Sequence, residues 1–302
     1  MSEGRRNYSG IIKGPLPPGD GPNLRQFSLP GAPIQWIKKL GEGDQAFVYK
    51  VRIWSQDYAL KVFKFSNPKD NRFYWRTGLK DELPMKKAII YTDPFYAECR
   101  AYGRIQDGRF DKESKLPCIR QQVAVKCYGY LLLGRQDERW LISQGHDLRS
   151  DLIDSEVREA LGGDTRVRAI VKHVHEGPKS LHAGNIRRAW ANVRLLNNSL
   201  KIYNMDIKAN NFIGFRLVDF GSSWTEPHAI LQYLEDKEGG VPAKYVTGND
   251  KRHFDDMIAK EQIPTRLKAT HRPRYQLRSQ GEAPWAGQAL PERRRANTPR
   301  LG

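Results

Sequence analysis

The chain has 302 residues and a net charge of +17, with 39% hydrophobic and 28% charged residues. This length suffices for a large domain with a packed core, and the composition is that of a globular protein with polar extensions. The longest apolar run, residues 130–133, is too short for a membrane span, and the start of the chain lacks the apolar core of a signal peptide. Three cysteines without zinc-like spacing indicate a reducing compartment. We therefore expect an intracellular protein, nuclear or cytoplasmic.

Both ends of the chain have compositions that favour little structure. Residues 1–33 hold six of the 18 prolines and six of the 26 glycines, which predicts a flexible leader. Residues 265–302 are rich in Arg, Pro, Gly and Gln without periodicity, which predicts a disordered basic tail. From Arg266 onward nine Lys or Arg stand against two Glu. Such a tail would either make weak, salt-dependent contacts with nucleic acid or only keep the protein soluble, and both alternatives stay open.

The segment 34–145 is predicted to form a small β-rich part with one main helix. Asp93 as N-cap and a proline in the first helical position predict that helix over Asp93–Ile105, after a polar insertion at 66–92. β-branched and aromatic residues predict five strands, at Ile34–Leu40, Phe47–Trp54, Asp57–Phe65, Val123–Leu133 and Glu138–Ser143.

From residue 146 to 264 the pattern is mainly helical. Two closely spaced apolar runs, Asn211–Gly214 and Phe215–Phe220, predict a small hairpin. Only 43 residues, 222–264, follow the Gly221 turn before the tail, so the helical part is expected to be short. Apolar spacing predicts helices at Leu148–Leu161, Asn185–Leu200, 228–236 and 251–261.

The first candidate site residues are the glycines between the first two strands. Gly41 and Gly43 would let backbone amides lie close over an anion, although an ordinary two-glycine hairpin turn explains the same residues.

A lysine in the third strand is the second candidate. Lys61 lies within an apolar strand, where an ammonium group is costly to bury unless it is paired. Glu98, in the middle of the predicted helix, is the candidate partner. A lysine that reaches out to solvent and a glutamate on a solvated helix face are the alternatives.

The third candidate is the sequence from Asp206 to Asn211, which has the spacing Asp-x-Lys-x-x-Asn and leads directly into an apolar strand. A carboxylate can orient a hydroxyl acceptor, the ammonium group of Lys208 can neutralise a phosphate, and an amide oxygen can hold a metal without adding charge. Asp219 stands eight residues beyond Asn211 at the tip of the next strand, where it could meet a hard cation.

In this order and spacing, these residues resemble the eukaryotic protein-kinase superfamily across residues 34–225. The stretches 205–208, 217–220 and 223–228 are similar to a fungal family, the kinetochore Sim4 complex subunit of the Fta type, whose filamentous-fungal members are kinase-like. The resemblance implies an α+β, protein-kinase-like bilobal fold over residues 34–264. Its N-lobe, about residues 34–145, would be small and β-rich with one main helix, and its C-lobe, about 146–264, would be helical and shortened.

The resemblance also implies a binding site for ATP and Mg²⁺. The adenine would lie near residues 141–144, a placement that follows from position alone. The implied roles are ATP binding by Gly41, Gly43, Val48, Lys61 and Glu98, metal binding by Asn211 and Asp219, and catalysis by Asp206 as base with Lys208 assisting the transferred phosphoryl group.

Two departures from the kinase pattern leave the function open. Asn204-Met205 stands where kinases carry His-Arg, and no Ala-Pro-Glu follows Gly221. An active phosphotransferase acting on an unidentified hydroxyl acceptor is one hypothesis, because every charged group that the chemistry needs is present. A pseudokinase scaffold, a subunit of a nuclear assembly of the kinetochore type with protein partners, is the alternative.

Overall fold

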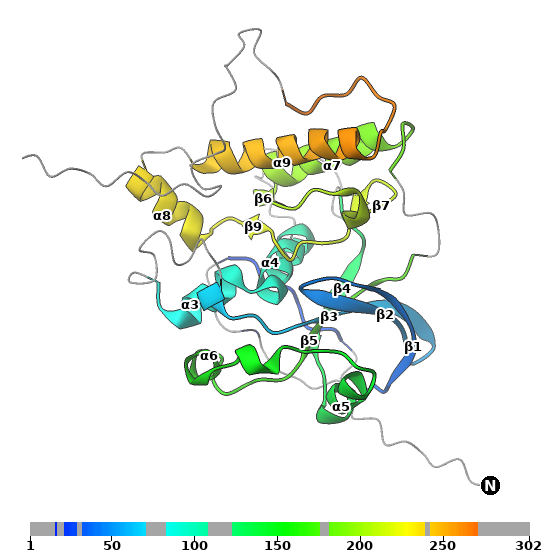
Figure 1. Ribbon diagram of the computed structural model, residues 1–302, viewed down its shortest axis with the longest axis vertical. Helices are drawn as coiled ribbons and strands as arrows, with labels where there is room; N and C mark the ends of the chain where they lie inside the picture. Colours follow the sequence, from blue (N-terminus) through cyan, green and yellow to red (C-terminus); the bar gives the residue numbers. More distant parts are fainter. Residues whose placement is uncertain are drawn as a thin grey trace, which may run out of the picture. The chain divides into compact units, whose positions relative to one another are not determined.

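The computed structural model describes residues 16, 21–28, 32–70, 83–107, 123–175, 181–238 and 242–270, and those up to Ala269 belong to one compact unit (Figure 1). The strands are β1 (Ile34–Glu42), β2 (Ala46–Ile53), β3 (Gln56–Phe63), β4 (Cys127–Leu132), β5 (Arg168–His173), β6 (Ile202–Tyr203), β7 (Phe212–Ile213), β8 (Arg216–Leu217) and β9 (Trp224–Thr225). The helices are α3 (Met85–Thr92), α4 (Pro94–Asp107), α5 (Arg135–Ser143), α6 (Ser155–Ala160), α7 (Ile186–Asn198), α8 (Ala229–Glu238) and α9 (Pro242–Lys260), with 3₁₀ turns η1 (Pro68–Asp70), η3 (Ser150–Leu152) and η4 (Ala209–Asn211). Among the helices that the structure describes, none has both the length and the apolar character of a membrane span.

A five-stranded antiparallel sheet in the order β1-β2-β3-β5-β4 forms the N-terminal part. Alternate residues of β2, among them Val51 and Ile53, are buried, which is the pattern that predicted a strand. The register pairs Val48 directly with Lys61, so both side chains leave the sheet on the same face. The sheet followed by helices is a mixed α+β fold, as predicted.

The prediction of a strand at Glu138–Ser143 is wrong, because these residues belong to helix α5. Acidic side chains occupy the first turn of α5, where the helix dipole favours them, and Gly145 at φ 80° leads the chain out of the helix. The apolar run at 140–142 is too short for its periodicity to distinguish a helix from a strand.

The strand that completes the sheet is β5, which lies beyond residue 145, where we expected the helical part to begin. It pairs with both β3 and β4, and all its residues except His173 are buried. Two charged side chains interrupt its apolar pattern, Arg168 and Lys172, and Arg168 forms a buried ion pair with Asp93 at 3.0 Å. A strand buried on both faces is expected to be continuously apolar, so these charges concealed β5 in the sequence.

Part of the predicted flexible leader is packed into the fold. Leu24 and Phe27 are buried, the amide of Phe27 donates to the Tyr130 carbonyl at 2.8 Å, and the amide of Tyr130 donates to the Arg25 carbonyl at 3.1 Å. The prediction is therefore wrong for residues 21–28, because a high content of proline and glycine does not prevent the few apolar side chains from docking beside a strand. The predicted basic tail lies, from residue 271 onward, outside the described residues.

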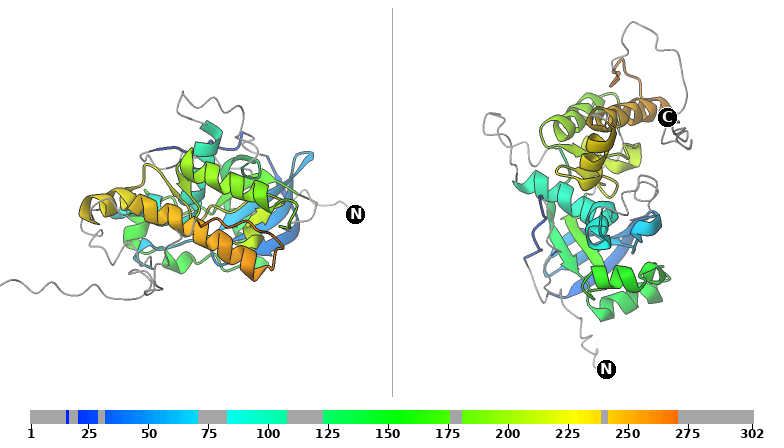
Figure 2. Two further views of the ribbon diagram at one scale, coloured as in Figure 1. Left: turned by 90° about the horizontal axis from the view of Figure 1, so that it is seen from above. Right: turned by 90° about the vertical axis from the view of Figure 1, so that its left-hand side faces the viewer.

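Helix α4 runs between the sheet and the C-terminal helices (Figures 1 and 2). Asp93 caps it as predicted, since its Oδ1 accepts a hydrogen bond from the Phe95 amide at 2.9 Å. The Phe95 ring meets Phe63 of β3 with centroids 5.4 Å apart, and Tyr102 meets Phe220 at 5.1 Å. The middle of α4 is thereby fixed between the sheet and the segment after β8.

The C-terminal part is organised around α7 and α9, which lie side by side (Figures 1 and 2). The predicted hairpin is present as the pair β7 and β8, and β6 pairs with β9. The predicted helices at 228–236 and 251–261 correspond to α8 and α9, whereas Leu148–Leu161 is helical only in η3 and α6. The predicted apolar face of α7 is buried: Ile186, Ala189, Val193 and Leu196.

Candidate functional site

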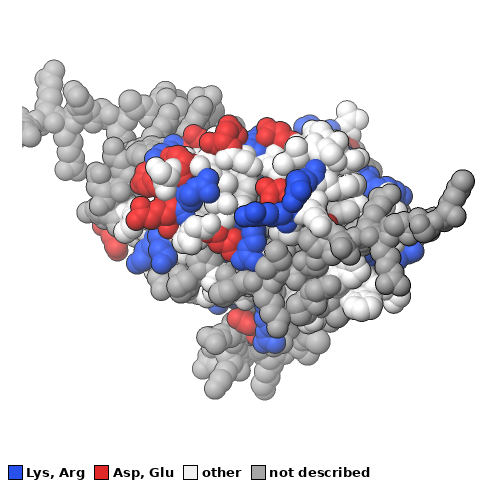
Figure 3. Space-filling view, turned by 90° about the horizontal axis from the view of Figure 1, so that it is seen from below, with Lys and Arg blue, Asp and Glu red and all other residues white. Residues whose placement is uncertain are grey.

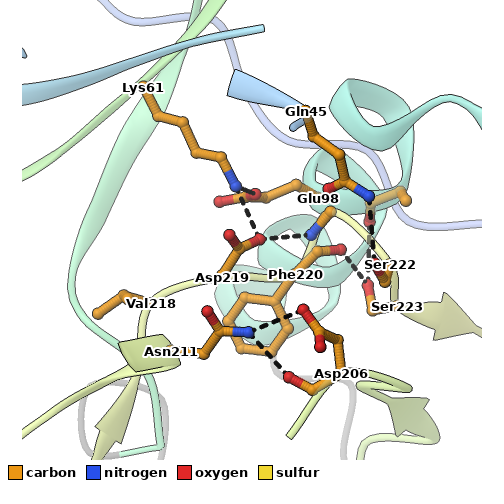
Figure 4. A network of polar contacts seen from close by, with 12 residues as sticks. Gln45, Lys61, Glu98, Asp206, Asn211, Val218, Asp219, Phe220, Ser222 and Ser223 are labelled. Atoms are coloured by element: carbon orange, nitrogen blue, oxygen red, sulfur yellow. Dashed lines mark hydrogen bonds and ion pairs between the residues drawn. The ribbon is translucent and has the colours of Figure 1, made fainter. Parts of the chain in front are cut away.

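Lys61 of β3 is the centre of a buried polar network (Figure 4). Its side chain is 6% exposed, and Nζ donates to Glu98 Oε2 and to Asp219 Oδ1, each at 2.7 Å. Burial by itself would lower the pKa of Lys61, but the attraction of the two carboxylates outweighs it and raises the pKa above its ordinary value. The lysine is therefore a fixed positive charge held by two separate parts of the chain.

Glu98 of α4 has no exposed surface, and its carboxylate is held by two lysines rather than one. One oxygen accepts from Lys61 and the other from Lys172 of β5, a residue that the sequence analysis did not single out. Lys172 also donates to the Val218 carbonyl at 2.5 Å. The charged residue within an otherwise apolar run was the available signal, but the predicted sheet did not include β5.

Asp219 follows β8 and faces the sheet. Its Oδ1 accepts from Lys61 and from the Gly221 amide, the latter at 2.9 Å. Burial would raise the pKa of this carboxyl, but the attraction of Lys61 and Lys172 outweighs it and holds the pKa well below its usual range. Asp219 is thus an anion that points at the lysine of the sheet.

The Asp206–Asn211 segment lies beside Asp219 in the same network (Figure 4). The Asn211 amide group donates to the Asp206 carbonyl at 2.8 Å and to Asp206 Oδ2 at 3.1 Å, which leaves the Asn211 amide oxygen for another partner. Lys208 pairs with Asp206 at 2.7 Å. The Asn204 side chain donates to the Asp219 carbonyl at 2.7 Å, so the two acidic segments are directly joined.

Asp250 of α9 anchors the start of this segment. It has no exposed surface, and its carboxylate accepts from the backbone amides of Asn204 and Met205, both at 2.8 Å. Burial raises the pKa of Asp250 to about 6, against the opposing effect of these amide hydrogen bonds. Sequence reasoning missed this residue, although an aspartate four residues after Val246 and four before Phe254, both buried, stands on the apolar face of a helix.

The glycine turn between β1 and β2 comes close to the Asp219 segment through Gln45. The Gln45 amide group donates to Ser222 Oγ at 3.2 Å, and a Cβ on Gly221 would lie 2.4 Å from Gln45 Oε1. At Gly41 a Cβ would meet nothing within 4 Å, and at Gly43 only a carbonyl oxygen at 4.0 Å. The fold itself would therefore accommodate a side chain at either glycine.

The structure does not bring residues 141–144, predicted to lie near the adenine, to this network. They belong to α5 and its end, and the neighbouring Trp140 stacks on Trp36 of β1 with centroids 4.6 Å apart. Lys61, Glu98 and Asp219 meet directly, and Asp206, Lys208 and Asn211 lie together beside Asp219. Val48 pairs with Lys61 in the sheet, whereas Gly41 and Gly43 come near the network only through the neighbouring Gln45.

Comparison with known protein families decides the relationship of this chain. A family model described as kinetochore Sim4 complex subunit FTA2 matches residues 12–224. The chain belongs to this family. No curated protein matches its sequence. The FTA2 match contains every predicted site residue, from Gly41 to Asp219, whereas Asp250 and helix α9 lie beyond it.

The FTA2 family match also contains Lys172, Gln45 and the packed segment at 21–28. It begins within the predicted leader, at residue 12, which agrees with the burial of Leu24 and Phe27. The buried network of Lys61, Glu98 and Asp219 is therefore a feature of the part of the chain that defines its FTA2 membership.

Proposed function

We propose that the chain is a subunit of a kinetochore complex of the Sim4 type and carries a protein-kinase-like site for ATP with Mg²⁺. The first part follows from the family match over residues 12–224. The second part is carried by one observation, the buried ammonium group of Lys61 held between Glu98 and Asp219. A sheet with one helix that supplies the lysine's partner, followed by a helical part, also supports a kinase-like bilobal fold.

The residues present suit a magnesium nucleotide. Asp219 offers a carboxylate and Asn211 a free amide oxygen, the hard oxygen ligands that Mg²⁺ prefers. Lys61 offers a charge for phosphate oxygens, and the open space above Gly41 would allow a phosphate to approach the backbone. When bound, Mg²⁺ would neutralise phosphate charge.

Binding of Mg-ATP is expected to raise the melting temperature of the protein, because a ligand that binds only the folded state stabilises it, by about 2.7 kcal/mol at a hundredfold excess over Kd. The rise should disappear on chelation of the metal and in Asp219→Ala, and should persist in Asp256→Ala, an exposed aspartate on α9. A wild-type melting temperature that does not respond to Mg-ATP would refute the nucleotide site.

Phosphoryl transfer is the second candidate function, favoured by Asp206 with Lys208 and Asn211 bonded to its carboxylate. In this reaction Asp206 would accept the proton of the hydroxyl acceptor. Asp206→Ala should lower single-turnover transfer or hydrolysis of the γ-phosphate by about 100-fold or more. Mg-ATP binding without turnover would instead favour a scaffold, which the missing Arg before Asp206 and the missing Ala-Pro-Glu also favour.

The role in the assembly is tested separately, by fluorescence imaging of the tagged chain in its own cells. A kinetochore subunit should form foci that coincide with a centromere marker, and it should co-purify with the other subunits of the complex. A diffuse signal that never coincides with centromeres would contradict the proposal.

Nucleic-acid binding receives no support from the face that contains α5 and α6. Basic and acidic residues are interspersed on it (Figure 3), rather than gathered by sign as a phosphate-binding surface requires. Contact through the basic tail at 265–302 stays a prediction, since residues 271–302 lie outside the described part of the chain.

A further inference from the structure

Lys172 is a buried charge that the proposed nucleotide chemistry does not use. Its side chain is 7% exposed, lies on the central strand β5, and has two polar partners, the Glu98 carboxylate and the Val218 carbonyl. It therefore ties together the sheet, helix α4 and the residue immediately before Asp219. Among the described side chains, Lys61 and Lys172 are the two that bond both to Glu98 and to the 218–221 segment.

Stability alone does not account for a lysine at this position. Its neighbours in β5, Ile170 and Val171, are fully buried, and the site could hold an apolar side chain. Replacing buried ion pairs by apolar residues is often neutral or stabilising, because desolvation of the charges offsets their attraction. A lysine that is costly to bury points to a requirement for its charge and its hydrogen bonds.

The charges around Glu98 indicate what that requirement is. Lys61 and Lys172 balance Glu98 and Asp219, so the four groups are neutral together. A nucleotide phosphate would draw Lys61 towards itself, and a metal would compete with Lys61 for Asp219. With Lys61 as its only partner, the fully buried Glu98 would then lose part of its compensation, which is costly.

We propose that Lys172 is a positioning residue of the nucleotide site: it holds Glu98 and the backbone at Val218 against the sheet, independently of Lys61. Lys61 can then serve the phosphates and Asp219 the metal while α4 stays docked. This inference rests on the proposed Mg-ATP site. The site would then be assembled before the ligand binds. Lys61 would serve the ligand, and Lys172 would hold Glu98 in place.

The test compares Lys172→Met with Lys126→Met in the full-length chain, the latter removing an exposed lysine next to β4. Lys172→Met should weaken Mg-ATP binding, measured by calorimetry, by about 10- to 100-fold, the usual effect of removing a residue that supports a ligand-binding group. Without nucleotide, hydrogen exchange should become faster in α4 and at 218–221. Lys126→Met should change neither quantity.

A lysine with a merely structural role would lower the melting temperature with and without Mg-ATP by the same amount and leave the Kd unchanged, which would overturn the proposal. If the wild type does not bind Mg-ATP, the proposed function fails, and hydrogen exchange alone then decides: unchanged exchange in Lys172→Met refutes the positioning role.

If Lys172→Met does not fold, the double variant Glu98→Gln with Lys172→Met removes one charge of each sign and should restore folding. Because Glu98 is itself a predicted ATP-binding residue, the double variant is compared with Glu98→Gln. An equal affinity for Mg-ATP in the two variants would refute the proposal, and a lower affinity in the double variant would support it.

Discussion

Replacing Glu98 by glutamine is expected to lower the free energy of unfolding by about 3–5 kcal/mol, the effect of removing one partner from a buried ion pair. The carboxylate has no exposed surface and is the shared partner of Lys61 and Lys172. With a neutral amide at position 98, two buried ammonium groups would face the single carboxylate of Asp219. Chemical denaturation of wild type and variant at neutral pH measures the difference.

The matched control is Glu156→Gln. Glu156 also pairs with a lysine, Lys69 at 2.6 Å, but its side chain is 54% exposed. An exposed pair contributes about 0–1 kcal/mol, so this variant should be close to wild type. Equal effects of the two substitutions would show that the buried network does not depend on the Glu98 charge.

Removing the Asp250 carboxylate should have an effect of similar size. Asp250→Ala leaves the amides of Asn204 and Met205 without their partner inside the protein, and each buried unsatisfied donor costs about 1–3 kcal/mol. Met205 has a positive φ of 64°, so its conformation depends on these bonds. We expect a loss of about 2–6 kcal/mol in unfolding free energy, together with loss of Mg-ATP binding, because Asp206 follows directly.

The stability difference between wild type and Asp250→Ala should also change with pH, and the direction of that change does not depend on the size of the difference. The pKa of Asp250 is raised from 3.8 to about 6 in the folded protein. The folded state therefore binds the proton more tightly than the unfolded state, and the resulting stabilisation is present below pH 3.8 and is lost as the pH rises through about 6. The stability of wild type relative to Asp250→Ala should fall between about pH 4 and pH 6.

Denaturation curves at several pH values check this, with Asp256→Ala as the control on the exposed face of the same helix. A difference between wild type and Asp250→Ala that is constant or rises over this pH range would contradict it. A variant as stable as wild type throughout would show that the two amides find other partners.

Local spacing in the sequence determined the arrangement of several site residues, one helix cap and one buried helix face. The Asp-x-Lys-x-x-Asn sequence, the hairpin after it and Asp219 just beyond the hairpin's second strand lie within 14 residues of chain, so their mutual placement follows from short-range geometry. The cap at Asp93 and the apolar face of α7 were visible for the same reason, since a helix repeats every 3.6 residues. That a buried Lys61 needs an anionic partner also followed, because an ammonium group in an apolar strand is costly to bury alone. The choice of Glu98 as that partner depended on the resemblance to kinases.

Only the tertiary structure decided which distant residues complete the network. Lys172 lies 74 residues along the chain from its partner Glu98, and Asp250 lies 46 residues from Asn204. Gln45 lies 177 residues from Ser222. A short apolar run, such as that in α5, is equally compatible with a helix and a strand until its neighbours select one. Periodicity shows which face of an element is buried, but the partner of a buried charge depends on how the chain as a whole folds back, and no local pattern encodes it.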